Sequence, residues 1–435
     1  MRRTLYTHLL DWKASKRRKP LIIQGARQTG KTYLLQEFGR LEYSRVCYVN
    51  FEETPDLEDL FAKDLDPRNI LRNLSLYAGW TIEPGRDLVI LDEIQTSNNA
   101  LNSLKYFHEK ARDYHIVSAG SLLGLKLSKP KSFPVGKVNF FKLYPLTFLE
   151  FLEAVGKADL KDLIEQTDSF TPYPKPFHND LLDLLRKYYF VGGMPEAVET
   201  FHSTGDLEKV RTVHKEILTS YALDFAKHAS SAEVPKLSLI WESIPAQLAR
   251  ENRKFIFSAI KKSARARDYE NAITWLVDAG LIYKSYRVPT MKSPLTSYMD
   301  RSAFKVFLLD VGLLGAMTRV HSNILIKGDR IFREYEGAFV ENYIAQQLHS
   351  EKGIDLFYWK REGKKAEIDF LCEFENGIFP LEVKAGINPK SKSLRSFDDQ
   401  FSPSVLFRTN LLNLKRDAKI CNIPLYAITL FPRHI

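Results

Sequence analysis

Short apolar runs alternate with amphipathic segments through the first third of the chain. The runs span residues 21–24, 46–51, 88–91 and 115–119, and stretches of helical periodicity such as 32–38 and 101–113 lie between them. Uninterrupted apolar runs of this length are typical of strands buried on both faces, and their alternation with helices favours a parallel sheet. A last strand at 137–142 and a capped helix start at Thr147 follow. The sequence therefore predicts an α/β domain over residues 1–155.

The hydrophobic pattern changes further along the chain. Residues 156–235 are predicted to be helical, with a proline-rich connection before residue 178. Residues 236–325 combine helices with two apolar strands, which favours a winged-helix domain. A helix, alternating strands and another helix then predict a further α/β domain over 326–435, with the boundary near residues 323–330.

Composition and charge narrow the class of protein. Hydrophobic residues make up 44% of the chain and aromatic residues 12%, which indicates packed cores and excludes general disorder. The net charge of +10 favours anionic partners, nucleic acid ahead of a membrane surface. Cys47, Cys372 and Cys421 are scattered without metal-ligand spacing, as expected in a reducing compartment. No apolar run approaches the roughly 18 residues of a membrane span, and we see no signal peptide. A cytoplasmic protein without a membrane partner is expected.

Residues 25–32, Gly-Ala-Arg-Gln-Thr-Gly-Lys-Thr, fit the phosphate-binding pattern G-x4-G-K-[ST]. The motif follows a predicted strand and opens a helix, which is the context that this loop requires. Backbone N–H groups of the loop and the positive end of the helix dipole favour phosphate there. Lys31 is predicted to reach the β- and γ-phosphates of ATP, and Thr32 to ligate Mg²⁺. The candidate nucleotide-binding residues are Gly25, Ala26, Arg27, Gln28, Thr29, Gly30, Lys31, Thr32 and Tyr33.

The predicted strand 88–91 runs into two acids, Asp92 and Glu93. An acid at the carboxyl end of a parallel strand projects into the ligand-binding crevice. We predict that Asp92 holds Mg²⁺ and that Glu93 polarises the attacking water. Ser121, after the fourth strand, could contact the γ-phosphate or orient the water, or could simply form a turn. Asn50, after the second strand, could hold Glu93 inactive, although a turn asparagine is the simpler interpretation.

Several motifs in a fixed order resemble the AAA+ superfamily ATPases of the bacterial and archaeal type that carry a C-terminal domain of unknown function. They lie at 25–32, 91–95, 119–121, 136–137, 143–148, 191–197, 309–313 and 381–384. The resemblance implies a P-loop domain, a helical and winged-helix middle, and a C-terminal α/β domain. That family generally shows Gly-Arg where this chain has Gly136-Lys137. Since lysine lacks the planar fork of arginine, the identity of any arginine finger stays open.

The predicted winged helix offers a possible contact surface for nucleic acid. Helix 268–280 carries or follows basic and amide side chains, and strands 281–288 and 304–309 could pair as the wing. Such units place a recognition helix in the major groove. The candidate contacts to phosphates or base edges are Arg265, Arg267, Asn271 and Lys284. Packing against another protein is the alternative, and both stay open.

Charged residues near the C-terminus resemble the D…E-x-K core of restriction-endonuclease-like nucleases. Asp369 lies on one predicted strand, and Glu382 and Lys384 share one face of the next. Asp369 and Glu382 are predicted to bind Mg²⁺ or Mn²⁺, because hard carboxylate ligands suit these ions. Glu341, on the helix 336–347, would be an outer helper, and Lys384 would stabilise the transition state.

Two functions remain open from the sequence. The first is an ATP-binding and ATP-hydrolysing AAA+ protein that acts on DNA, with metal-dependent nuclease activity left open. The alternative is a nucleotide-switched regulator that binds DNA or protein and whose nuclease-like domain is catalytically idle. ATP and DNA are the expected partners, and a homo-oligomer is left open.

Overall fold

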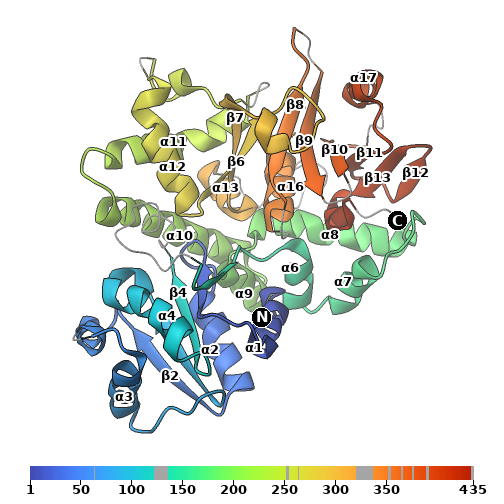
Figure 1. Ribbon diagram of the computed structural model, residues 1–435. Coiled ribbons are helices and arrows are strands. Elements are labelled where there is room, and N and C mark those ends of the chain that lie inside the picture. The colour runs from blue at the N-terminus through green and yellow to red at the C-terminus, as the bar shows by residue number, and fades with distance from the viewer. Residues whose placement is uncertain are drawn as a thin grey trace. The chain divides into compact units, whose positions relative to one another are not determined.

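The computed structural model describes residues 1–62, 64–121, 136–250, 254–262, 264–319, 337–350, 354–363, 366–374, 377–387 and 391–432. The chain forms two compact units. The first contains Met1–Tyr144 with Asp278–Leu281, and the second contains Pro145–Val277 with Ile282–Ile435. The predicted boundary at 323–330 lies outside the described residues. Both units are mixed α/β structures, which confirms the predicted fold class (Figure 1).

A five-stranded sheet with the order β2-β3-β4-β1-β5 forms the centre of the first unit. Its strands are β1 (Leu21–Gln24), β2 (Arg45–Asn50), β3 (Asp87–Asp92), β4 (His115–Gly120) and β5 (Asn139–Lys142). Every neighbouring pair is parallel, as predicted. The carboxyl ends of β1, β3 and β4 are therefore adjacent at one edge, where the loop 25–30 and the acids after β3 lie.

Helices cover both faces of this sheet, which is why its central strands are apolar on both sides. Helices α1 (Leu5–Ala14) and α2 (Lys31–Glu42) pack on one face. The opposite face is covered by η1 (Pro55–Phe61), α3 (Pro67–Ala78) and α4 (Asn98–Lys110). Figure 1 shows these two helical layers. A short 3-10 turn, η2 (Ile94–Thr96), directly follows the acids of β3.

The second unit begins with helices, as predicted for residues 156–235. They are α6 (Phe148–Ala154), α7 (Ala158–Glu165), α8 (Lys175–Val191), α9 (Pro195–Thr204), α10 (Leu207–His228) and α11 (Val234–Leu248). Further along the chain come η3 (Phe257–Ala259), α12 (Ala266–Asp278), η4 (Leu295–Tyr298), α13 (Val311–Met317), α16 (Ala338–Ser350), α17 (Lys392–Phe401) and η5 (Leu425–Leu430). None of the helices in the described residues is long and apolar enough to cross a membrane.

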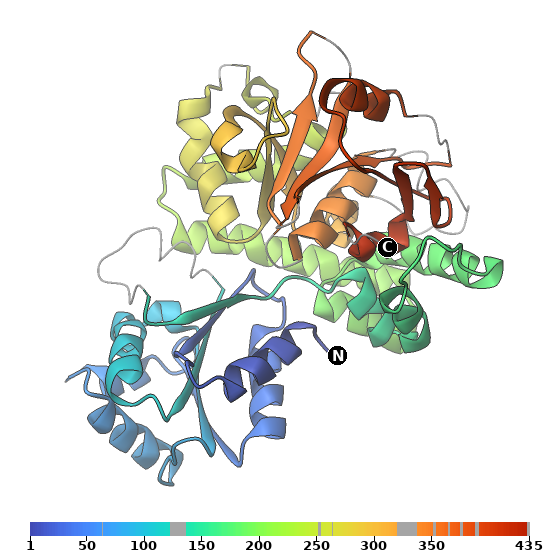
Figure 2. The same cartoon turned by 45° about the vertical axis from the view of Figure 1, so that its right-hand side comes forward.

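An eight-stranded sheet with the order β12-β13-β11-β10-β9-β8-β6-β7 completes the second unit. Its strands are β6 (Ile282–Arg287), β7 (Asp300–Leu308), β8 (Leu356–Lys360), β9 (Glu367–Phe374), β10 (Gly377–Val383), β11 (Leu406–Asn410), β12 (Lys415–Asp417) and β13 (Ile420–Pro424). The two strands expected to form a wing do pair, as β6 and β7, and β6 also pairs with β8. The predicted winged-helix and endonuclease-like segments therefore share one sheet (Figure 2).

Residues of three sequence motifs, 143–148, 191–197 and 309–313, meet inside the second unit. Asp310 accepts hydrogen bonds from the N–H groups of Gly193, at 2.6 Å, and Leu313, at 3.0 Å. A Cβ atom at Gly192 would lie 2.2 Å from Oδ1 of Asp310, and one at Gly193 would lie 2.1 Å from the carbonyl oxygen of Leu146. Only glycine fits at either position, so these motifs are a packing junction. This agrees with the structural role expected of 192–195.

Candidate functional site

The loop between β1 and α2 has the backbone form of a phosphate cradle. Gln28 and Gly30 have φ angles of 64° and 89°, which turn the loop so that α2 begins at Lys31. The Lys31 ammonium group is buried and donates to the carbonyl oxygens of Gly25, at 2.9 Å, and Ala26, at 2.8 Å. Burial lowers the pKa of Lys31 to about 8, although the nearby carboxylates of Glu93 and Asp92 oppose this change. The ammonium group therefore lies against the cradle, where phosphate oxygens could replace the two carbonyls.

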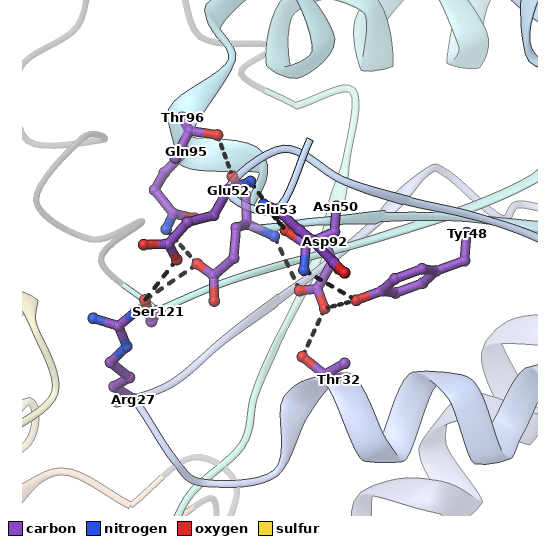
Figure 3. A network of polar contacts seen from close by, with 11 residues as sticks. Arg27, Thr32, Tyr48, Asn50, Glu52, Glu53, Asp92, Gln95, Thr96 and Ser121 are labelled. Atoms are coloured by element: carbon purple, nitrogen blue, oxygen red, sulfur yellow. Dashed lines mark hydrogen bonds and ion pairs between the residues drawn. The ribbon is translucent and has the colours of Figure 1, made fainter. Parts of the chain in front are cut away.

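Thr32 and Asp92 lie together, as their predicted roles require. The Thr32 hydroxyl donates to Oδ2 of Asp92 at 2.6 Å, and the N–H of Glu93 donates to Oδ1 at 3.0 Å (Figure 3). Asp92 is buried, so these bonds replace the water that its carboxylate would otherwise bind. A hydroxyl and a carboxylate are the oxygen ligands that suit Mg²⁺, and Thr32 and Asp92 would hold that ion.

Tyr48 is a member of this network that the sequence analysis missed. Its hydroxyl donates to Oδ2 of Asp92 at 2.9 Å from the neighbouring strand β2. Burial and the charge of Asp92 raise the pKa of Tyr48, so the hydroxyl stays protonated and acts as a donor. The only signal in the sequence is that Tyr48 and Asn50, two residues apart, lie on the same face of β2.

The Glu93 side chain is held by two neighbours in an unusual backbone position. Glu93 has a φ angle of 49°, and its Oε2 accepts from the Gln95 amide at 2.5 Å and the Ser121 hydroxyl at 3.3 Å. Asn50 instead accepts from the N–H groups of Glu52 and Glu53. The structure thus favours the turn interpretation of Asn50, and Gln95 and Ser121 contact Glu93 in its place.

The remaining candidate residues of the first unit are partly or largely exposed. Arg27 forms an ion pair with Glu52 at 3.3 Å. Tyr33 is 56% exposed on the first turn of α2. Lys137, where the resembled family has arginine, pairs with Glu109 at 3.2 Å.

Asp369, Glu382 and Lys384 come together at the ends of β9 and β10. Asp369 accepts from the N–H of Val383 at 2.8 Å, and Glu382 pairs with Lys384 at 2.9 Å. Glu382 also accepts from the hydroxyl of Ser391. Burial raises the pKa of Glu382, while the charge of Lys384 opposes the change. Both oxygens of Glu382 have partners, so a metal ion there would compete with Lys384 and Ser391 for the carboxylate.

Glu341 has a different partner from the one its predicted role would require. Its carboxylate lies 3.6 Å from the ammonium of Lys305, which also pairs with Glu367 at 2.6 Å. Lys305 and Glu341 are both buried. Within the described ranges, no group of three or more His, Cys, Asp or Glu side chains could hold a metal ion. Glu341 is therefore not gathered with Asp369 and Glu382 into such a group.

The candidate nucleic-acid contacts lie at two places in the second unit. Arg265 lies just before α12, Arg267 lies in its first turn and Asn271 in its second turn, and all three are exposed. Lys284 instead lies over the aromatic ring of Phe304, with its ammonium 5.1 Å from the ring centre.

A comparison with known protein families finds matches to three segments of the chain. Residues 17–152 match the family described as "AAA domain". The N-terminal segment has the fold of an AAA domain. Two further families, both described as domains of unknown function, match residues 182–323 (DUF8612) and 336–428 (DUF4143), and the latter agrees with the expected C-terminal domain. No curated protein matches the sequence.

Similar solved structures share low sequence identity with this chain. The Walker-type ATPase PABY2304 of Pyrococcus abyssi is 14% identical over 73% of this chain and 95% of its own, with a TM-score of 0.47. The Orc1 protein of Aeropyrum pernix, in complex with DNA, is 13% identical over 73% and 90%, with a TM-score of 0.30. The RuvB Holliday junction branch migration motor of Thermotoga maritima is 15% identical over 63% and 85%, with a TM-score of 0.30.

Proposed function

We propose that the AAA domain binds ATP with Mg²⁺ and hydrolyses it. The observation that carries this proposal is the 2.6 Å contact between Thr32 of the P-loop and Asp92 of β3, with Glu93 next in the chain. When bound, Mg²⁺ would neutralise charge on the phosphates. Lys31 would exchange its two carbonyl partners for phosphate oxygens, and Glu93 would orient the attacking water and accept its proton.

Glu93→Gln and Lys31→Ala test this function separately. Glu93→Gln should retain ATP binding and abolish turnover, because an amide cannot accept the proton of the water. Lys31→Ala should weaken binding itself. Phosphate release and binding of a fluorescent ATP analogue are measured for both, with the exposed acid Glu83→Gln as the control. Parental turnover by Glu93→Gln would refute the role of Glu93.

DNA is the proposed macromolecular partner. The net charge of +10 supports it, and so do the exposed side chains of Arg265 and Arg267. In this proposal ATP binding and hydrolysis drive or gate an action on DNA. Self-association through copies of the chain is compatible with it.

DNA cleavage at the C-terminal cluster is a second candidate function. The approach of Asp369 to the backbone of Val383, beside Glu382 and Lys384, favours it. Plasmid DNA is incubated with the full chain and Mg²⁺ or Mn²⁺, and Asp369→Ala should abolish nicking while ATP turnover continues. If the parental chain does not cut DNA under these conditions, the alternative of a nucleotide-switched regulator with an idle nuclease-like domain is favoured.

A further inference from the structure

Arg27 places a guanidinium group beside the proposed hydrolytic centre. It is the third residue of the eight-residue phosphate loop, and its ion pair with Glu52 leaves the two side chains 33% and 37% exposed. Figure 3 draws Arg27 and its partner Glu52 together with the network around Glu93, whose Oε2 accepts from the Ser121 hydroxyl at 3.3 Å. The positive charge of Arg27 is also among the causes that lower the pKa of Lys31, so the two cations are near each other. Arg27 is therefore a cation of the phosphate loop that, like Glu93, lies close enough to Lys31 to affect its pKa.

A further cation near the γ-phosphate favours ATP hydrolysis because negative charge shifts during the reaction. The oxygen of water forms a bond to the γ-phosphorus, and the bond from that phosphorus to the β–γ bridging oxygen breaks. ADP leaves with the electron pair, and the proton of the water passes to Glu93. Negative charge on the γ-phosphate oxygens and the leaving oxygen is then stabilised by a nearby arginine, whose planar fork can bind two oxygens.

Glu52 is a weak and replaceable partner for Arg27. The pair joins two partly exposed side chains at 3.3 Å, and such surface pairs contribute about 0–1 kcal/mol. Glu52 lies on the turn after β2 whose backbone is organised by Asn50. A phosphate carrying more charge than one carboxylate would compete effectively for the guanidinium.

We propose that Arg27 is a catalytic residue that binds the γ-phosphate during hydrolysis, supplied from within the P-loop itself. Glu52 holds Arg27 to one side until the nucleotide arrives. This inference rests on the proposed ATPase function and identifies the arginine that Lys137 does not supply. Lys137 is paired with Glu109.

Binding of a transition-state mimic tests the inference without relying on turnover. Affinities for ADP, and for ADP with aluminium fluoride and Mg²⁺, are measured for the full chain and its variants. The parental chain should bind the aluminium fluoride complex at least about tenfold more tightly than ADP. Arg27→Ala should lose most of this preference while its affinity for ADP changes by less than about threefold, because ADP has no γ-phosphate. Arg27→Lys should restore little of it.

Glu52→Gln should act in the opposite direction and strengthen binding of the aluminium fluoride complex, because Arg27 is released. Arg40→Ala is the matched control, since Arg40 forms an ion pair with Glu37 at 2.8 Å on α2 in the same unit. A parental chain that binds neither ATP nor the mimic would refute the proposed ATPase function and the inference together. A parental preference that Arg27→Ala retains, or an equal loss in Arg27→Ala and Glu52→Gln, would overturn only the role of Arg27.

Discussion

The Tyr48 hydroxyl stabilises Asp92 from the neighbouring strand and can be removed without changing the ring. In Tyr48→Phe, Asp92 keeps the Thr32 hydroxyl and the Glu93 N–H as donors. The loss of one hydrogen bond to a charged group costs about 1.5–3 kcal/mol, so Mg²⁺-dependent ATP binding should weaken by roughly tenfold or more. Mg²⁺ titrations at fixed ATP measure the effect.

Tyr6→Phe is the control for this prediction. It removes a hydroxyl that donates to Glu42 at 3.0 Å, so the chemistry is the same but the place is different. Equal Mg²⁺ dependence in the two variants would show that Tyr48 does not support the metal-binding carboxylate.

His214 makes stability depend on pH in the second unit. Its Nε2–H donates to the Val191 carbonyl at 2.9 Å, and its Nδ1 accepts from Arg211 at 3.3 Å, so the ring is neutral. Burial, with the charge of Arg211, lowers the pKa of His214 to about 3 from 6.5. As pH falls below 6.5 the unfolded chain takes up a proton that the folded chain does not. Stability therefore falls with falling pH, by at most about 1.4 kcal/mol per unit for this one proton.

His214→Gln should flatten this dependence, because glutamine can keep a donor and an acceptor without titrating. Urea unfolding between pH 4 and 7, roughly the range of the shift, gives the free energy of unfolding at each pH. The exposed residue His202 provides the control variant His202→Gln, which should keep the parental slope. The same slope in His214→Gln as in the parent would contradict the assignment.

Residues close in sequence were easier to predict than residues joined across strands. The positions of Lys31 and Thr32 follow from one motif, and Asp92 follows from a strand that ends in acids. In the structure, Thr32 contacts Asp92, as expected when both lie at the carboxyl edge of one parallel sheet. Tyr48 and Glu52 depend on which strand lies beside which, and the spacing of one motif does not contain that information.

At the scale of elements, the helix start at Thr147 shows how far local rules reach. Thr147 accepts from the N–H of Glu150 at 3.2 Å, and the Glu150 carboxylate accepts from the N–H of Thr147 at 3.0 Å. This reciprocal cap lies within four residues, so it could be predicted from the sequence alone.

Helix α16 shows why other elements could not be assigned in this way. Its polar residues bind the backbone of distant segments: Asn342 accepts from the N–H of Leu308 at 2.7 Å, and Gln346 accepts from the N–H of Val311 at 2.9 Å. Such contacts are indistinguishable from a functional polar face until the partners are known. Glu341 on the same helix likewise contacts a distant segment, since its carboxylate pairs with Lys305 of β7.

The junction between α8 and α9 yields a prediction at this scale. In Gly193→Ala the new Cβ would lie 2.1 Å from a backbone carbonyl oxygen of Leu146, which cannot rotate away. Overpacking of this kind costs about 1–3 kcal/mol or more, so the melting temperature should fall by several degrees. Gly386→Ala is the control, because no atom lies within 4 Å of its added Cβ. Equal stability of the two variants would mean that the junction is loosely packed.

For the whole molecule, the assignment of strands to sheets was the hardest feature to predict. A helix followed by a hairpin suggests a winged helix, and β6 and β7 do form that hairpin. However, β6 also pairs in parallel with β8, some seventy residues later in the chain. The pairing of distant strands is set by the packing of the complete unit, which hydrophobic periodicity does not report.

Charge distribution over the whole molecule gives the last prediction. If phosphates bind near α12, DNA affinity should fall steeply with salt, because each neutralised phosphate releases counterions. Reversing Arg265 and Arg267 to Glu together should weaken binding and lower the slope of log affinity against log salt by about one per lost contact. The matched control reverses Arg68 and Arg72, exposed on α3 of the first unit, and causes the same change in net charge. Fluorescence anisotropy with labelled duplex DNA measures both variants. An equal loss would mean that only overall charge matters, whereas a selective loss would place the DNA contact at the start of α12.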